Sequence, residues 1–218
     1  MSDNLPVQAP VSGNLSKLTA GKAYLRRISL LQSGSELVKA GSVERGGVFV
    51  HHPSKDAIEK MGTEFQSLLI GYRPRADHWA GGTLKSISYD DTSDAFLEIA
   101  RRAPTCKFGD PESFRYGPEF IFYIPSINAG HGGFVTFYCH NVSQRRAAAG
   151  ADAHVGKPVT VRAKFTKTAQ HSFHVFEIVP FSGTLSPEPS KEDYDEAVRL
   201  FQDRPSTPEK AASSGVEQ

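Results

Sequence analysis

Eight histidines and two cysteines are the residues of this chain best suited to holding a metal ion. Their spacing argues against it, because the chain has no CxxC or HxxxH pair. His171 and His174 are three apart on an expected strand and so point to opposite faces. We therefore expect polar surface histidines, with no metal site and no cofactor.

Catalytic patterns are equally sparse. The chain contains no GxSxG and no HExxH. Gly150–Pro158 resembles a phosphate loop, but it has five residues between its glycines and Pro158 in place of the Mg²⁺-binding hydroxyl. Asp90, Asp91 and Asp94 lie at a loop–helix junction, where carboxylates commonly cap helices. We predict that the protein is not an enzyme, with a metal-dependent nuclease using these aspartates as an alternative.

Cationic side chains accompany aromatic ones at four separate places. Aromatic rings can stack on any nucleobase while cations neutralise phosphates, so this pattern is typical of sequence-tolerant single-strand binding. A solvated basic surface is the competing interpretation. The predicted nucleic-acid-binding residues are Tyr24, Arg26, Tyr72, Arg73, Arg75, Trp79, Phe134, Tyr138, His140, Arg145, Arg146, Arg162, Lys164 and Lys167.

Two alternating strands determine which of these side chains should be exposed. Gly133–Phe137 matches the last five positions of the RRM signature, but the preceding residues break the match. On that strand we expect Phe134, Tyr138 and His140 to form an exposed stacking platform. On the opposite face and on the next strand, the predicted core residues are Val135, Phe137, Val159, Val161 and Phe165.

The net charge of +1 conceals an uneven distribution along the chain. Residues 181–218 contain eight acids and four bases, which leaves the preceding 180 residues at +5. Residues 145–167 alone carry six cations and one acid. This asymmetry favours a nucleic-acid partner for the body, with the acidic tail either shielding the groove, docking replication proteins or aiding solubility.

The elements that must position these residues are mostly strands. The fold class we predict is mainly β, an OB-type barrel with few short helices, because a helical segment at 143–151 separates two pairs of strands. Residues 1–20 should form a flexible arm, 21–182 the barrel, and 183–218 an acidic tail with an amphipathic helix at 190–203. The expected strands cover 24–31, 48–52, 65–73, 119–125, 134–141, 158–167 and 173–181, with one further helix at 94–102.

Several classes are disfavoured by composition. No apolar run approaches the roughly 20 residues of a membrane span, and the N-terminus does not have the pattern of a signal peptide. Two cysteines are too few for a disulfide scaffold. We expect an intracellular protein with no membrane partner.

A series of short motifs resembles a family of bacteriophage and prophage OB-fold single-stranded DNA-binding proteins. The motifs are the opening 24–31, the segments 67–75 and 116–125, then 134–140 and 156–161, followed by the proline- and acid-containing tail. The resemblance implies a non-catalytic protein of DNA replication or recombination that coats single strands in the cytoplasm of the bacterial host. The short acidic extreme C-terminus of bacterial single-strand binders is missing, which puts recruitment of partners by the tail in doubt.

These observations favour one function and leave two alternatives. The leading prediction is sequence-tolerant binding of single-stranded DNA, with RNA as a second possible ligand and homo-oligomerisation as a further expectation. One alternative is a virion or assembly protein whose β-rich body self-associates. The other is the nuclease named above.

Overall fold

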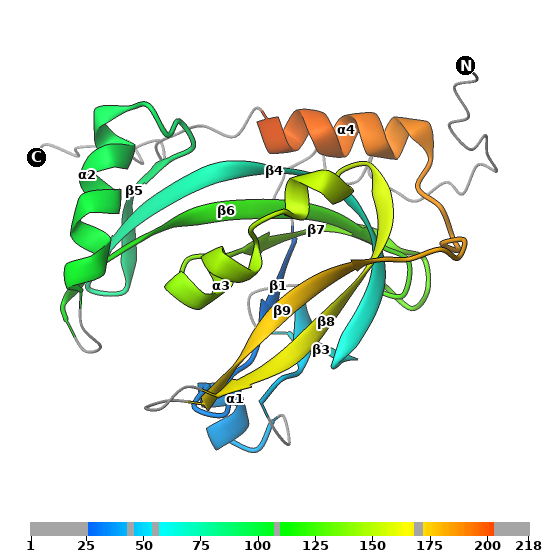
Figure 1. Cartoon of the computed structure of the whole chain (residues 1–218), viewed down its shortest axis with the longest axis horizontal. Helices are drawn as coiled ribbons and strands as arrows, with labels where there is room; N and C mark the ends of the chain where they lie inside the picture. The colour runs from blue at the N-terminus through cyan, green and yellow to red at the C-terminus, as the bar shows by residue number, and fades with distance from the viewer. Residues whose placement is uncertain (1–25, 43–45, 54–56, 107–109, 168–171, 203–218) are drawn as a thin grey trace, which may run out of the picture.

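The computed structural model describes residues 26–42, 46–53, 57–106, 110–167 and 172–202, and it is mainly β. Its strands form one curved sheet in the order β3-β2-β1-β7-β6-β4-β8-β9, with β5 paired to β4 (Figure 1). All pairings are antiparallel except that of β1 with β7. The strands are β1 Arg26–Leu30, β2 Phe49–His52, β3 Glu59–Gly62, β4 Glu64–Ala80, β5 Thr83–Ser88, β6 Glu112–Ile124, β7 Gly133–Tyr138, β8 Lys157–Lys167 and β9 Ser172–Pro180.

Four α-helices and two short 3₁₀ segments accompany the sheet in the described residues. The helices are α1 Glu36–Lys39, α2 Asp94–Arg102, α3 Val142–Ala147 and α4 Lys191–Gln202, and the 3₁₀ segments are η2 Ala103–Thr105 and η3 Ala151–His154. No helix in these described stretches is long and apolar enough to cross a membrane.

The main core fills the concave side of the curved sheet. Phe176 of β9 packs edge-on against Phe137 of β7 at 5.0 Å between ring centroids, and Phe49 of β2 packs edge-on against Phe65 of β4 at the same distance. Strands far apart in the sheet order therefore share one apolar interior. Burial of this apolar surface is the main force that curls the sheet.

The curled sheet remains open along its described strands. The side chain of Gln32 accepts a hydrogen bond from the backbone N–H of His174 and donates one to the carbonyl of that residue, at 2.7 and 2.8 Å. This amide joins β9 to the chain just after β1, but no ladder closes the two ends of the sheet order in the described residues. The predicted barrel is thus not confirmed, whereas the mainly β class is.

Helices cover two other parts of the sheet. The long β4–β6 ladder extends beyond the core, and there α2 buries Phe96 and Ile99 against Phe114. The N-terminus of α2 is capped by Ser93, whose hydroxyl accepts from the Phe96 N–H. On the convex face, α4 buries Phe201 and other apolar residues against β4, β6 and β7 (Figure 1). The helix predicted to lie in the tail is therefore packed on the sheet.

Two burial predictions are wrong for identifiable reasons. Alternation predicts Phe134 as part of an exposed platform, but it is only 9% exposed because the convex face that carries it is covered by α4. Alternation also predicts Phe165 in the core, but it is 60% exposed because the β8–β9 hairpin extends past the concave interior. Val135, Phe137, Val159 and Val161 are buried as predicted.

Most of the predicted helices and strands are present in the structure. The predicted helix 94–102 is confirmed, and the predicted 143–151 segment corresponds to α3 with part of η3. Strands β3 and β5 were not predicted, because neither has a marked apolar alternation. The predicted arm 1–20 and the chain after Gln202 lie outside the described residues.

Substituting two phenylalanines of one hairpin tests where the core ends. We expect Phe176→Ala to lower the free energy of unfolding by about 3–5 kcal/mol, because it opens a cavity among buried rings. Phe165→Ala should change it by less than about 0.5 kcal/mol, as an exposed substitution does. Urea unfolding followed by circular dichroism measures both, and equal losses would contradict the assignment.

Candidate nucleic-acid interface

One face of the β4–β6–β7 ladder carries ionic and aromatic side chains where the cover of α4 ends. Successive strand residues alternate between faces, so Arg73, Arg75, Asp77 and Trp79 of β4 share this one. The pairing register places Arg73 opposite Glu119 on β6. We call this surface the polar shelf, and it comprises Arg73, Arg75, Asp77, Trp79, Arg115, Glu119, Tyr138 and His140.

The closed end of the polar shelf is an ion-pair network around a fully buried carboxylate. Glu119 accepts hydrogen bonds from Arg73 Nε and Nη2 at 3.0 and 2.8 Å, and from Arg75 Nη1 at 2.7 Å. Arg73 also donates to the backbone carbonyl of Phe201, and its guanidinium lies 3.6 Å from the ring centroid of Tyr89. Arg73 is therefore fixed in place as the group that ties α4 to the sheet.

Arg75 connects this buried network to the aromatic part of the shelf. Its Nη2 donates to Asp77 Oδ2 at 3.1 Å, and its guanidinium lies 4.4 Å from the ring centroid of Tyr138. The Tyr138 hydroxyl donates in turn to the Arg75 carbonyl at 3.3 Å. Burial raises the pKa of Asp77 above its usual value, although Arg75 and Arg115 oppose the rise. Burial likewise raises the pKa of the Tyr138 phenol.

His140 lies beside Tyr138 with 5.4 Å between ring centroids. Its position depends on Gly117, where a Cβ would come within 2.0 Å of the Cys139 carbonyl oxygen, so only glycine lets the end of β7 approach β6 this closely. Burial, assisted by Arg115 and other nearby arginines, lowers the pKa of His140 to about 4. The imidazole is therefore neutral at pH 7, and it presents an uncharged ring.

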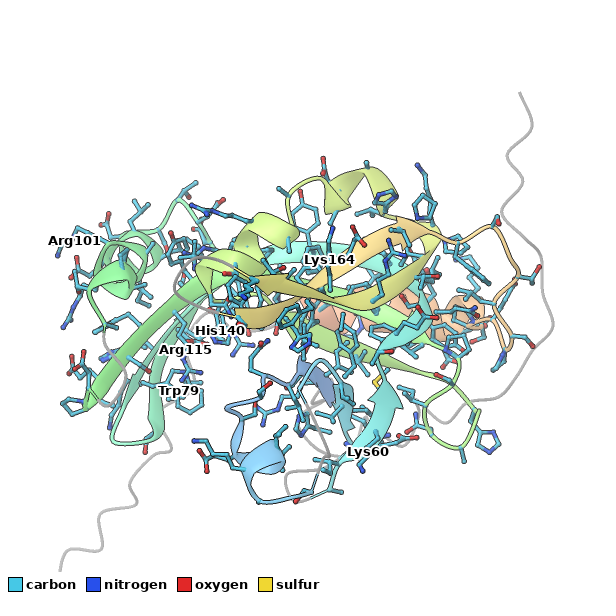
Figure 2. The ribbon with its side chains drawn as sticks, turned by 60° about the horizontal axis from the view of Figure 1, so that its bottom comes forward. Lys60, Trp79, Arg101, Arg115, His140 and Lys164 are labelled. Atoms are coloured by element: carbon cyan, nitrogen blue, oxygen red, sulfur yellow. The ribbon has the colours of Figure 1, made fainter. Side chains whose placement is uncertain are left out.

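The open end of the shelf consists of Trp79 and Arg115. The Arg115 guanidinium lies 5.6 Å from the Trp79 ring centroid, within cation–π range. Figure 2 shows Arg115 between Trp79 and His140, with Lys164, Lys60 and Arg101 in other parts of the molecule. Arg115 forms no salt bridge with any described residue. With three arginines and two carboxylates, the shelf has a surplus of one positive charge.

The structure brings together five of the predicted binding residues and separates the others. Those on the shelf are Arg73, Arg75, Trp79, Tyr138 and His140. Tyr24 lies outside the described residues. The remaining predicted residues lie elsewhere, namely Arg26, Tyr72, Phe134, Arg145, Arg146, Arg162, Lys164 and Lys167.

Several of these separated residues already have partners. Arg145 donates to the carbonyls of Tyr116 and His140 at 3.0 and 2.6 Å and lies over the Tyr116 ring. Arg162 and Lys164 both bond Glu177, at 2.6 and 3.2 Å. Arg145, Arg162 and Lys164 are therefore held by partners other than the shelf side chains.

Two other predicted residues lie away from the shelf as well. Arg26 donates to the Asn128 side chain at 2.5 Å. Tyr72 is 49% exposed, but it faces the concave side, where it lines a hollow of about 380 Å³ with Arg145.

Sequence reasoning missed three members of the shelf, namely Asp77, Arg115 and Glu119. Arg115 precedes Tyr116, so it repeats the cation–aromatic pattern found elsewhere and could have been recognised. Asp77 and Glu119 carry no such signal, because their role depends on the register between β4 and β6.

Three observations on the described residues concern the alternative chemistries. No group of three or more His, Cys, Asp or Glu among them could hold a metal ion. Asp90 accepts from the Thr92 N–H and hydroxyl at 3.0 and 2.6 Å, and the hydroxyl bond chiefly lowers its pKa. Burial raises the pKa of the Cys139 thiol, which disfavours the reactive thiolate.

Comparison of the chain with protein-family models, curated proteins and solved structures found no match. The resemblance to bacteriophage single-strand binders therefore stays a prediction. The geometry of the polar shelf is the basis for a functional assignment.

Neutralising the buried carboxylate tests the closed end of the shelf. Glu119→Gln should lower the free energy of unfolding by about 3–5 kcal/mol, because it removes the buried charge to which both Arg73 and Arg75 are hydrogen-bonded. Glu177 also bridges two cations but lies on the exposed hairpin, so Glu177→Gln is a matched control that should cost about 0–1 kcal/mol. Chemical denaturation measures both, and equal effects would contradict the proposed role of the network.

The lowered pKa of His140 predicts a pH dependence of stability. In the unfolded chain this histidine binds a proton near its ordinary pKa of 6.5, and in the folded chain its pKa is about 4. The contribution of His140 to the free energy of unfolding therefore decreases by about 3 kcal/mol as the pH drops from about 6.5 to 4. Asp77 has a raised pKa, so its protonation increases the free energy of unfolding as the pH falls and opposes the effect of His140. Comparison with His140→Gln isolates the contribution of His140. Denaturation of both proteins at pH 7 and pH 4.5 measures it, and parallel pH profiles would contradict the assignment.

Proposed function

We propose that the protein binds single-stranded DNA without sequence preference, through the open end of the polar shelf. The observation that carries this proposal is the placement of Trp79 and Tyr138 beside Arg115 and Arg75 on one sheet face. Aromatic rings next to guanidinium groups provide both interactions that single-strand binding requires, namely base stacking and phosphate neutralisation.

Arg115 is the group best placed to contact phosphate. It has no salt bridge within the described residues, whereas Arg73 is fixed by Glu119 and Phe201. Arg75 is held by Glu119 and Asp77 and has a side chain only 17% exposed. We therefore assign phosphate neutralisation chiefly to Arg115 and assign to Arg75 the positioning of Tyr138.

Trp79 is the strongest candidate for base stacking. It is the only tryptophan of the chain and is half-buried, so its indole is held in place while part of it meets solvent. Tyr138 and neutral His140 lie on the same face and are half-buried, with the Arg75 guanidinium over the Tyr138 ring. Because every base presents a π-face, such a surface tolerates any sequence.

The proposed cellular role follows from this binding mode. A protein that holds single strands without reading their sequence suits DNA replication or recombination, and the motif resemblance suggests a bacteriophage setting. An RNA oligonucleotide of the same length would show whether the 2′-hydroxyl matters, since that group distinguishes RNA from DNA at a binding site.

Substitutions at the open end should weaken binding while the fold is retained. Arg115→Gln removes one phosphate contact, so we expect lower affinity and a salt dependence of log K shallower by about 0.7. Trp79→Ala should cost about 1–3 kcal/mol of binding free energy through lost stacking. Fluorescence anisotropy with a labelled oligothymidylate at 50 and 200 mM salt measures both effects.

Arg101→Gln is the control for this experiment, because it removes an exposed arginine of α2 away from the shelf (Figure 2). Wild-type affinity in the Arg115→Gln protein, or equal losses in both variants, would refute the proposal. Degradation of the oligonucleotide in the presence of Mg²⁺, abolished by Asp91→Ala, would instead support the nuclease alternative.

A further inference from the structure

Strand β9 forms one end of the sheet order and pairs only with β8 in the described part of the chain. An unpaired strand edge presents N–H and C=O groups that can bind another extended chain. Near its start the edge is already occupied, because the Gln32 side chain bonds both the N–H and the C=O of His174. Among the described residues, the adjoining part of β9 has no such partner.

The direction of the free backbone groups follows from the ladder. In an antiparallel pair, residues alternate between those that exchange both hydrogen bonds with the partner strand and those that exchange none. His174 bonds Gln32, so it belongs to the second set, and so do Phe176 and Ile178. The Ala163 N–H, opposite Phe176, donates to the Thr63 carbonyl at 2.8 Å and thus points away from β9, as this alternation requires. The N–H and C=O groups of Phe176 and Ile178 therefore point outward.

A hollow of about 280 Å³ lies along this edge. One wall is β9 from Val175 to Ile178, and the other is the segment that joins α3 to η3, which lies on the side of β9 away from β8 (Figure 1). The lining on that side comes from Ala147 at the end of α3, from Ala149 and Gly150 of the joining segment, and from Ala151 and His154 of η3. Except for His154, these residues have little or no side chain, which leaves room for a guest backbone between the two walls. The space suits a single extended segment, whereas the sheet edge of a second copy would meet the α3–η3 wall.

The charge beside the hollow indicates the chemistry of that segment. Lys164 and Glu177 both line it, and Arg162 shares Glu177 with Lys164. Two cations against one carboxylate leave one positive charge in surplus. An acidic side chain on the guest would complement it.

We propose that the free edge of β9 binds an extended, acidic peptide segment of a partner protein by strand addition. The backbone groups of Phe176 and Ile178 pair with the peptide, as in other domains that bind peptides between a strand edge and a helix. Pro180 has no N–H and so ends the free edge. This site is separate from the polar shelf, and peptide binding does not depend on the proposed DNA binding.

A displayed library of random ten-residue peptides, selected on the full chain, provides the probe. We expect selected sequences to alternate β-branched residues with Asp or Glu, and a synthetic peptide of that kind to protect the Phe176 and Ile178 amides from hydrogen exchange. Ile178→Pro removes an outward N–H without removing a β8 hydrogen bond and should weaken peptide binding at least ten-fold. Ala149→Trp, which fills the hollow from the other wall, should do the same even if Ile178→Pro proves unstable.

Ala153→Trp is the matched control, since Ala153 is exposed on η3 but does not line the hollow. It should bind the peptide as the wild type does, and Lys164→Glu should weaken binding several-fold. The inference is overturned if no peptide is selected, if the selected peptides bind Ala149→Trp as tightly as wild type, or if the edge is protected only through dimerisation of the chain. Loss of DNA binding in the Arg115→Gln protein would leave the peptide result unchanged.

Discussion

The carboxylate of Glu119 is the group on which the arrangement of this molecule depends. A fully buried negative charge is tolerated only when paired and hydrogen-bonded, and here the partners come from β4, as Arg73 and Arg75. Meeting them requires the observed register between β4 and β6. Arg73 then donates to the last turn of α4, so the same network also fixes where that helix ends on the convex face. One buried ion therefore couples strand register to helix docking.

This coupling explains why the convex face is divided into two parts. Under α4 the face is apolar, with Ile121 and Phe134 buried. Past the end of α4 it becomes ionic and aromatic, and it opens toward Arg115 and Trp79. Arg73, at the closed end, is held by Glu119. Arg115, at the open end, has no salt bridge among the described residues, so its guanidinium is the one best placed to contact a ligand. A rigid buried network is a suitable support for a binding surface, because it fixes the aromatic groups before the ligand arrives.

Much of the secondary structure could be predicted from the sequence, because its signals are local. The acid-to-base order of residues 94–102 predicted α2, and the i, i+3, i+4 pattern around Ala197 predicted α4. Alternation on β7 and β8 gave four correct core residues. The errors at Phe134 and Phe165 share one cause, since alternation identifies a face of a strand but not what lies against it.

The polar shelf was harder to predict than the elements. The cation–aromatic pattern included Arg75, Trp79 and Tyr138 of the shelf, but it treated all nearby cations as equally available. Which arginines are neutralised depends on carboxylates far away in the sequence, such as Glu119 for Arg73, and on the register that brings them together. The cluster of cations at 145–167 suggested a groove, whereas in the structure Arg145, Arg162 and Lys164 bond carbonyls or Glu177.

The intrinsic fluorescence of Trp79 tests the central claim most directly, because no other tryptophan contributes to the signal. The wild-type chain should be titrated with unlabelled oligothymidylate at low salt, then with added salt. Stacking on the shelf predicts that the oligonucleotide quenches the indole fluorescence, with the same midpoint concentration as the anisotropy titration. The quenching should reverse as salt is added. Binding seen by anisotropy with unchanged Trp79 fluorescence, or no binding at about 50 mM salt, would contradict the account.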